Sequence, residues 1–383
     1  TRETSQSQGI GDDVVFPIPS HNRKGLTMKT SRRSTMALLA ALGTLGFLTP
    51  AFAAPKTDFK VAWSIYVGWM PWGYASDTGI VKKWADKYGL TIEVTQFNDY
   101  VESINQYTAG SYDAVTLTNM DGLSIPAAGG VDTTAVIVGD FSAGNDAVLL
   151  KGPGTLADIK GRNVNLVEFS VSHYLLARAL DSVGMTEQDV KVINTADPDM
   201  VGAFQTPDVT AMVTWNPMVA EIAALPDATK VFDSAQIPGE IIDLMVANTE
   251  VLADNPDFGK ALAGIWYETA TLMTADTIEG AAARAAMGAA SGPDQAGFES
   301  QMAATKLFDK PGDAVAFTTS PDLPKTMDLV RGFLFDKGLL GSGAPSADVI
   351  GIEMPGGVVL GDAANIKLRF SDAYMKLAAD GAL

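Results

Sequence analysis

The chain has 383 residues, a formal charge of −18 and no cysteine. The excess of acid disfavours nucleic acid as a partner, because its phosphates would be repelled. The absence of cysteine excludes disulfides, thiolate zinc sites and cysteine nucleophiles, and we expect no amino-terminal lipid on a lipobox cysteine. The length exceeds what one hydrophobic core usually holds and predicts two domains.

The first 54 residues predict export. Residues 28–54 resemble a signal peptide, with a basic start at Arg32-Arg33, an apolar run at 37–48 and a small-x-small cleavage signature at 51–53. We expect residues 1–27 to be an upstream segment outside the fold. The arginine pair leaves a twin-arginine route open beside the general secretory path, which we favour. The apolar run is too short to span a bilayer, so the sequence predicts a periplasmic protein that is not embedded in the membrane.

Strand-like and helix-like runs alternate in the first part of the mature chain. Strand patterns lie at 60–65, 91–97, 113–118 and 133–139, and helix patterns lie at 74–88, 100–109 and 120–128. Asp99 is a suitable N-cap for the second helix. Such alternation predicts a parallel sheet with crossover helices.

A second αβ series follows, and the rest of the chain looks mostly helical to its end. Strand patterns lie at 163–167, 190–194, 209–214 and 241–247, with a helix pattern at 172–183. We expect 147–150 to carry the chain into a second lobe and 241–247 to return it. The predicted fold class is therefore α/β with two lobes, the first formed by residues 55–147 and 244–383 and the second by residues 148–243. Two crossing segments would make a hinge with a ligand cleft between the lobes.

Several motifs in this order resemble one known family. They are GSYDA at 110–114, Gly129-Gly130, SVSHYLL at 170–176, Gly184-Met185 with Asp189-Val190, and AMVTWNP at 211–217. With the exported amino terminus, they resemble periplasmic solute-binding proteins of the nitrate, sulfonate and taurine ABC transporter family. That resemblance implies a type II periplasmic binding protein fold, delivery of a small molecule to an ABC permease and its ATPase, no enzymatic activity, and a monomer.

Within that family the chain resembles the branch associated with urea carboxylase or guanidine carboxylase. The motifs that carry this resemblance are YVGWMPW at 66–72, TNMDG at 118–122 and the carboxyl-terminal LRFSDAYMKLAADGAL. The branch implies capture of guanidine or urea. It does not assign roles to individual residues, which must be argued from their chemistry.

The predicted cleft loops supply aromatic and acidic side chains and few bases. The ligand-binding candidates are Trp69, Trp72, Asp99, Asn119, Asp121, Asp146, Glu168, Ser170, His173, Trp215 and Asp243. The same strand ends also carry Tyr100, Asp140, Ser142, Asn145 and Asn216. Large aromatics beyond a strand end favour a ligand cleft, with core packing as the alternative. Carboxylates together with indoles favour a cation, and guanidinium both stacks on aromatic faces and pairs with carboxylates.

The acidic candidates have structural alternatives. Asp99 is more consistent with a helix N-cap than with a ligand contact, Asp121 is equally consistent with a cap of the next helix, and Asp146 could belong to a turn. Glu168 could satisfy the amides of the following helix, and Asp243 could serve the hinge.

Other readings remain open at this level. Trp215 could pack between the domains, and His173, alone in the mature chain, is more consistent with a helix-start or interface residue than with a catalytic base. No spacing indicates a metal, a cofactor or a nucleophilic serine. The alternatives to guanidine or urea are a sulfonate such as taurine, nitrate, a quaternary ammonium and, as a different class, an enzyme resembling thiamine-pyrimidine synthases.

Overall fold

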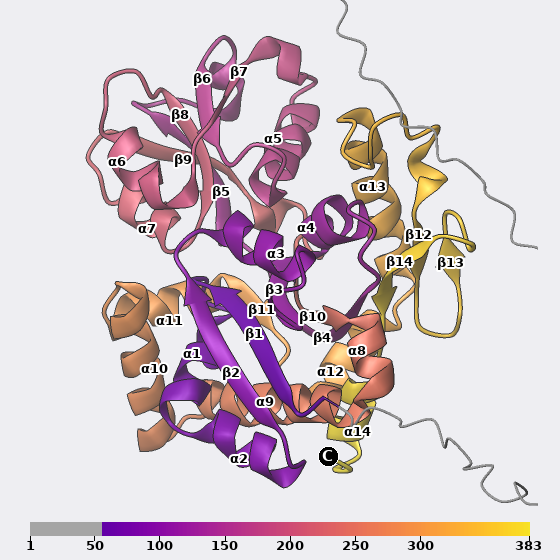
Figure 1. The fold of residues 1–383 in the computed structure, drawn as a ribbon. Coiled ribbons are helices and arrows are strands. Elements are labelled where there is room, and N and C mark those ends of the chain that lie inside the picture. The colour runs from indigo at the N-terminus through magenta and orange to yellow at the C-terminus, as the bar shows by residue number, and fades with distance from the viewer. Residues whose placement is uncertain (1–55) are drawn as a thin grey trace, which may run out of the picture. The chain divides into compact units, whose positions relative to one another are not determined.

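The computed structural model describes residues 56–383. The predicted upstream segment and signal peptide lie outside the described residues. Within the described part of the chain, no helix combines the length and the apolarity needed to cross a membrane. Two β-sheets with their helices make up residues 56–383 (Figure 1).

The larger sheet has nine strands and contains both early and late parts of the chain. Its strands are β1 (Asp58–Ser64), β2 (Thr91–Phe97), β3 (Ala114–Thr118), β4 (Thr133–Ser142), β10 (Ile242–Asn248), β11 (Thr305–Leu307), β12 (Gly351–Glu353), β13 (Val359–Leu360) and β14 (Ile366–Phe370). They lie in the order β13-β12-β14-β4-β10-β3-β1-β2, with β11 paired to β4. The predicted parallel pairing holds for β1 with β2 and with β3, whereas the return strand β10 lies between β3 and β4 and runs antiparallel to both.

The smaller sheet has five strands in the order β7-β6-β8-β5-β9. They are β5 (Asp146–Lys151), β6 (Asn163–Leu166), β7 (Lys191–Asn194), β8 (Ala211–Trp215) and β9 (Ala228–Asp233). The chain enters this sheet between β4 and β5 and returns between β9 and β10, close to the predicted crossings. The described residues 56–383 belong to one compact unit by their contacts, so the lobe boundaries at 147/148 and 243/244 stay a prediction.

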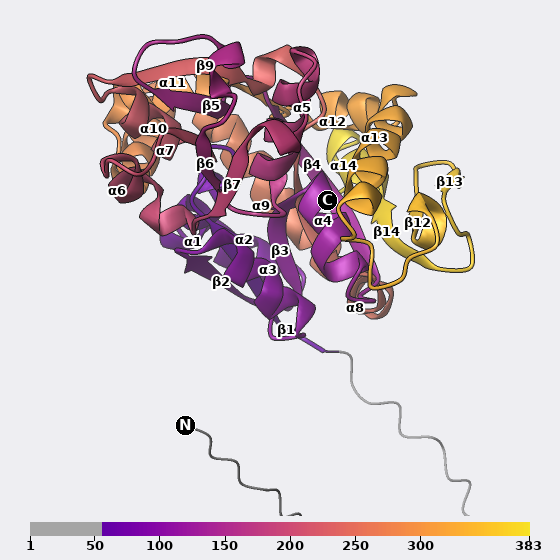
Figure 2. The same ribbon diagram turned by 90° about the horizontal axis from the view of Figure 1, so that it is seen from above.

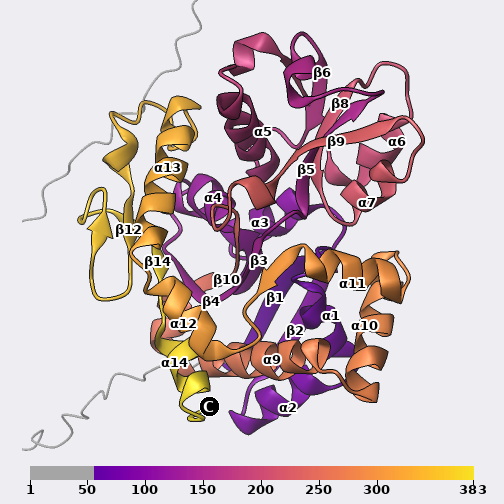
Figure 3. The ribbon, with the colours of Figure 1, turned by 180° about the vertical axis from the view of Figure 1, so that it is seen from behind.

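The helices cover the sheets and connect their strands. Their bounds are α1 (Met70–Asp77), α2 (Ile80–Lys87), α3 (Tyr100–Thr108), α4 (Asn119–Gly122), α5 (Val171–Ser182), α6 (Met200–Phe204), α7 (Met218–Ala223), α8 (Thr249–Asp254), α9 (Pro256–Thr274), α10 (Ile278–Ser291), α11 (Gln295–Ala303), α12 (Pro311–Thr318), α13 (Asp322–Asp336) and α14 (Ala373–Ala379). The long helix α9 packs against α1, α2, α10 and α14, whereas α3 packs against β1 and β3. In Figures 2 and 3, α13 lies beside β12 and β14.

Several element boundaries differ from the sequence prediction for local reasons. The helix predicted at 74–88 is two helices, because Gly79 takes a left-handed φ of 81° between α1 and α2. The helix predicted at 120–128 becomes the short α4 and a π-helical turn, Leu123–Ala127, that contains Pro126. The segment expected to be mostly helical also holds β11 to β14, which are two to five residues long.

Candidate functional site

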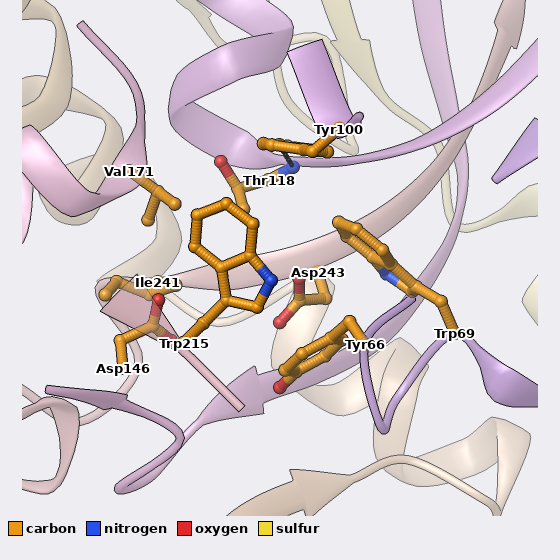
Figure 4. Close-up of a pocket in the computed structure, with 9 residues that line it drawn as sticks. All are labelled: Tyr66, Trp69, Tyr100, Thr118, Asp146, Val171, Trp215, Ile241 and Asp243. Carbon is orange, nitrogen blue, oxygen red and sulfur yellow. Dashed lines mark hydrogen bonds between the residues drawn. The ribbon is translucent and has the colours of Figure 1, made fainter. Parts of the chain in front are cut away.

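A pocket lies where strand ends of the two sheets meet (Figure 4). It encloses about 270 Å³ of atom-free space, part of it open to solvent, and is lined by Tyr66, Trp69, Tyr100, Thr118, Asp146, Val171, Trp215, Ile241 and Asp243. The larger sheet supplies the end of β3 and the start of β10, and the smaller sheet supplies the start of β5 and the end of β8. Ligands of α/β proteins commonly bind at such strand ends.

Four aromatic rings form a continuous wall of this pocket. The ring centroids are 5.2 Å apart for Tyr66 and Trp69, 5.5 Å for Trp69 and Tyr100, and 5.7 Å for Tyr100 and Trp215. Two of these contacts are edge-to-face, a favourable arrangement for aromatic pairs. Trp215 belongs to the smaller sheet and the other three rings follow strands of the larger one, so the wall joins residues carried by both sheets.

A tight turn after β1 places Tyr66 and Trp69 in this wall. The backbone N–H groups of Trp69 and Met70 both donate to the Tyr66 carbonyl, at 2.9 and 3.1 Å. Gly68 allows this turn to approach the carboxylates, because a Cβ on it would lie only 2.2 Å from Asp140 Oδ2 and 2.7 Å from the Tyr66 ring. The indole Nε1–H of Trp69 is buried and has no hydrogen-bond acceptor among the described residues.

Asp140 and Asp243 form a buried carboxyl pair beneath this turn. They are cross-strand partners in the antiparallel β4–β10 ladder, which brings their side chains close together. Asp140 Oδ2 is buried and has no hydrogen-bond partner among the described residues. The Tyr66 hydroxyl donates to Asp140 Oδ1 at 3.0 Å. Burial raises the pKa of Asp140 to about 7, although interactions with Asp243 and Tyr66 oppose the rise. Burial, and then the charge of Asp140, raise the pKa of Asp243 well above its usual range.

Asp146 adds a third buried carboxyl at the start of β5. Its cross-strand partner is Trp215, so the smaller sheet presents an acid and an indole side by side. Burial raises the pKa of Asp146 to about 7, with a hydrogen bond from Ser142 as the opposing effect and the charge of Asp121 as a further cause of the rise.

Asp121 lies behind Tyr100 and connects the larger sheet to the start of α5. Its Oδ2 accepts hydrogen bonds from the Tyr100 hydroxyl at 2.7 Å and Thr118 Oγ1 at 2.9 Å. Burial raises the pKa of Asp121 to about 6, while those hydroxyls and the Val171 N–H lower it. Its Oδ1 has no hydrogen bond of good geometry. A protein carboxylate therefore already faces the amides at the start of α5, where an anionic ligand would otherwise be favoured.

The lining of the pocket contains no base. Among residues 56–383, none that lines it is Lys, Arg or His, and its titratable groups are Tyr66, Tyr100, Asp146 and Asp243. Buried carboxyls without a cationic partner hold protons or attract a cation from outside the protein. This arrangement can stack a flat or methylated cation on aromatic faces and neutralise its charge with carboxylate.

Four of the sequence candidates line the pocket: Trp69, Asp146, Trp215 and Asp243. Trp72 does not line it. Because α1 already begins at Met70, Trp72 turns into the core and stacks on Trp266 with ring centroids 6.1 Å apart. Both indoles are buried in the hydrophobic core, as the core alternative predicts, but Trp69 also lines the pocket whereas Trp72 does not.

The remaining polar candidates have structural partners outside the pocket lining. Asp99 caps α3 by accepting from the Glu102 N–H at 2.9 Å. Asn119 fixes the return segment, accepting from the Ile242 N–H at 3.0 Å and donating to the Glu240 carbonyl at 3.1 Å. The backbone N–H of Glu168 donates to Asn194 Oδ1, and its half-buried side chain does not line the pocket.

Ser170 and His173 hold the start of α5 in place. Ser170 is the N-cap, with its hydroxyl oxygen accepting from the Ser172 N–H at 3.2 Å. His173 Nδ1 accepts from the Phe169 N–H at 3.1 Å, and Nε2 lies 3.1 Å from Glu187 Oε2 without good hydrogen-bond geometry. These contacts agree with the structural alternative given for His173.

Sequence reasoning missed Tyr66 and Thr118 and left Asp140 out of the candidate set. Tyr66 stands two residues beyond β1, in the same strand-end position that drew attention to Trp69. That position could have identified it. The pairing of Asp140 with Asp243 depends on the β4–β10 register, which no local pattern specifies.

Comparison with known proteins shows which family and which fold this chain shares with them. A model of the NMT1-like family matches residues 60–288. A putative binding protein of Brucella abortus is 27% identical over 258 residues, covering 64% of this chain and 75% of the relative. The taurine-binding periplasmic protein of Escherichia coli is 23% identical over 240 residues, covering 62% of this chain and 70% of that protein.

Solved structures share the fold at low identity. The alkanesulfonate-binding protein SsuA from Xanthomonas axonopodis pv. citri, bound to MOPS, has a TM-score of 0.62 and 16% identity, covering 76% of this chain and 96% of that one. The periplasmic nitrate-binding protein NrtA from Synechocystis has a TM-score of 0.54 and 12% identity, covering 86% and 99%. The predicted α/β periplasmic binding protein fold is confirmed.

Proposed function

We propose that this chain, which belongs to the NMT1-like family, is the periplasmic solute-binding component of an ABC importer and that its solute is guanidine or urea. Its partners would be that small molecule and the permease with its ATPase. Relatives described as binding proteins and the shared fold support a binding role rather than an enzymatic one. We keep the predicted cleavable signal peptide and the monomeric state as part of this proposal.

The observation that carries the choice of solute is an aromatic pocket whose ionisable lining groups are all carboxyls or phenols. Guanidinium is flat, stacks on aromatic faces and presents N–H groups that suit carboxylate acceptors. Asp146 and Asp243 would receive those N–H groups, and Trp69 and Trp215 would stack on the ion. An anionic solute would meet repulsion from the same carboxyl groups.

Capture would bring together residues that the two sheets carry separately. A solute between Trp69 and Trp215 contacts both sheets at once, so binding would favour the arrangement in which they are close. The closed form would then be the one that the permease recognises. In this mechanism the pocket residues bind and orient the solute and do no chemistry on it.

Size limits the affinity. Guanidinium has four heavy atoms, and a ceiling of about −1.5 kcal/mol per atom gives roughly −6 kcal/mol, or a dissociation constant of some tens of micromolar. Ionic pairing in a buried site could improve that value by a factor of ten or more.

A quaternary ammonium is the second candidate, and the four-ring wall is the observation that favours it. Aromatic cages bind such ions through cation–π attraction. A quaternary ammonium has no N–H donor, however, so it would leave the oxygens of Asp146 and Asp243 without hydrogen bonds. Taurine, another sulfonate or nitrate, the ligand classes named for relatives and solved neighbours, remain the competing anionic or zwitterionic solutes.

A thermal-shift panel tests this proposal. The purified mature chain is heated with guanidinium chloride, urea, methylguanidinium, choline, taurine or nitrate at about 1 mM, far below the molar concentrations at which guanidinium denatures. We expect guanidinium or urea to raise the melting temperature most. Stabilisation by taurine or nitrate with none by guanidinium and urea would overturn the choice of solute.

A further inference from the structure

Two buried carboxyls lie next to each other at the floor of the pocket. Asp140 is fully buried and Asp243 nearly so, and they face each other across the β4–β10 ladder. Two buried carboxyls in adjacent cross-strand positions repel each other when both are ionised, so this juxtaposition favours one proton held by the pair. Asp243 lines the pocket, whereas Asp140 lies behind it.

Among residues 56–383, the groups around the pair supply no compensating cation. Tyr66 from the turn after β1 donates to Asp140, and Asp146 from β5 and Asp121 beyond it are carboxyls themselves. Thr118 from β3 is the cross-strand partner of Asp243 and does not titrate. Each charge left on this cluster would stand near another of the same sign in a buried site.

We infer that the solute enters as a cation with N–H donors and displaces the proton that Asp140 and Asp243 share. This inference rests on the proposed function and decides between its two solutes, since guanidinium is charged and urea is neutral. The positive charge of the solute takes over the neutralising role of the proton. Asp243 then accepts N–H groups of the solute, and Asp140 keeps the hydrogen bond from Tyr66.

Proton exchange predicts a pH dependence with a definite sign. Below the range in which the pair titrates, the empty site holds the proton and the cation must compete with it. The association constant of the cation therefore rises with pH, by up to about tenfold per pH unit when one proton leaves per solute bound. A neutral solute has no reason to expel the proton, so its affinity would not rise in this way.

Calorimetry with guanidinium chloride on the mature chain measures the exchange directly. Titrations at pH 7 in two buffers with different ionisation enthalpies give the number of protons released. We expect roughly one proton per guanidinium. Asp140→Asn removes the shared proton but keeps a donor toward Asp243. We therefore expect this variant to bind guanidinium and to release less than half as many protons as the wild-type chain does. Asp99→Asn, at an exposed helix cap outside the pocket, should release the same number of protons as wild type.

The outcomes separate this inference from the proposed function. Guanidinium that binds without releasing protons would overturn proton exchange and leave the proposed function standing. Urea that binds while guanidinium does not would overturn the cationic solute but keep capture of a nitrogen-rich one. Choline that binds more tightly than guanidinium would overturn the requirement for N–H donors. If neither guanidinium nor urea binds, the proposed solute fails and this inference fails with it.

Discussion

Carboxylates lie partly buried in one region of this chain and fully buried in another, with opposite consequences. Asp132 accepts two hydrogen bonds from Arg369, at 2.9 Å from Nε and 2.8 Å from Nη2, and Arg369 also pairs with Glu353. Burial alone would raise the pKa of Asp132, but hydrogen bonds from Arg369 and Thr249 hold it below its usual value. Asp140, Asp146 and Asp243 meet no such cation, and their pKa values rise.

The difference shows what each region is built to do. A carboxylate held by an arginine fork is already satisfied and contributes to the fold. A buried carboxyl beside other carboxyls costs stability when ionised, and it becomes satisfied when a cation arrives from outside. The same residue type therefore acts as structure next to β14 and, in the function that we propose, as part of the binding site where the two sheets meet.

Removing one pocket carboxylate should have the largest effect on binding. We expect Asp243→Asn to weaken guanidinium binding at least about a hundredfold, because a buried charged hydrogen bond is lost. Calorimetry measures this loss. The amide of this variant still donates toward Asp140, as the shared proton does, so we expect the melting temperature of the empty protein to change little.

Asp132→Asn is the matched control in the other region. It should lower the free energy of unfolding by roughly 1.5–3 kcal/mol, because hydrogen bonds to a charged arginine are lost, and leave guanidinium affinity within about twofold. Equal loss of binding in both variants would contradict the division between the two regions.

The two indoles after β1 offer a second comparison between a pocket residue and a core residue, because Trp69 lines the pocket and Trp72 packs in the core. Trp69→Ala should weaken guanidinium binding at least tenfold, because one face of the stacking wall is removed. Trp72→Phe keeps a ring against Trp266 and should bind within about twofold of wild type while losing some stability. If Trp69→Ala left the affinity for guanidinium unchanged, the solute would bind at a place other than this pocket.

Asp121 is expected to act on binding through Tyr100. Asp121→Ala removes the acceptor of the Tyr100 hydroxyl and the carboxylate that faces the start of α5. We expect guanidinium binding to weaken at least about tenfold by calorimetry, as the ring loses its anchor and the site loses negative charge. If Asp121→Ala bound guanidinium as tightly as the wild-type chain, binding would not depend on the contact between Asp121 and Tyr100.

The smallest expected effect is the pH dependence of the empty protein. Unfolded aspartates titrate near pH 4, whereas Asp121 and Asp146 titrate at about 6 and 7 in the fold. The folded chain therefore binds more protons between these values, and stability from these groups falls as pH rises from about 4 to 7. Asp132 acts oppositely, losing its contribution as pH falls below about 4. We expect the melting temperature to fall from pH 5 to pH 8 and Asp146→Asn to flatten that slope; a rise would contradict the shifts.

The fold could be predicted where local patterns agree with it. Alternating runs located β1 to β4, β6 to β8 and β10, and the two crossings followed from their spacing. The strands β12 and β13 have only three and two residues and carry no periodic pattern long enough to recognise. The direction of β10 was missed because it depends on the chain's return from the other sheet, which no local pattern records.

The site was predictable to the extent that it lies at strand ends. That position alone nominated Trp69, Asp146, Trp215 and Asp243, which line the pocket, and their role in binding stays a prediction. Trp72 was predicted to line the cleft, but its ring points into the core because α1 begins at Met70. Pro71 is common in the first turn of a helix, but the sequence prediction began this helix at residue 74. The pairing of Asp140 with Asp243 needs the register of two strands more than 100 residues apart in sequence.

A calorimetric titration of the wild-type chain with guanidinium chloride and, separately, with taurine at pH 7 tests the acidic receptor site most directly. The carboxyls without a protein cation predict that guanidinium binds with a dissociation constant of some tens of micromolar or tighter and that taurine binds far more weakly. Tight binding of taurine with no heat from guanidinium would contradict the assignment of this pocket to a cation.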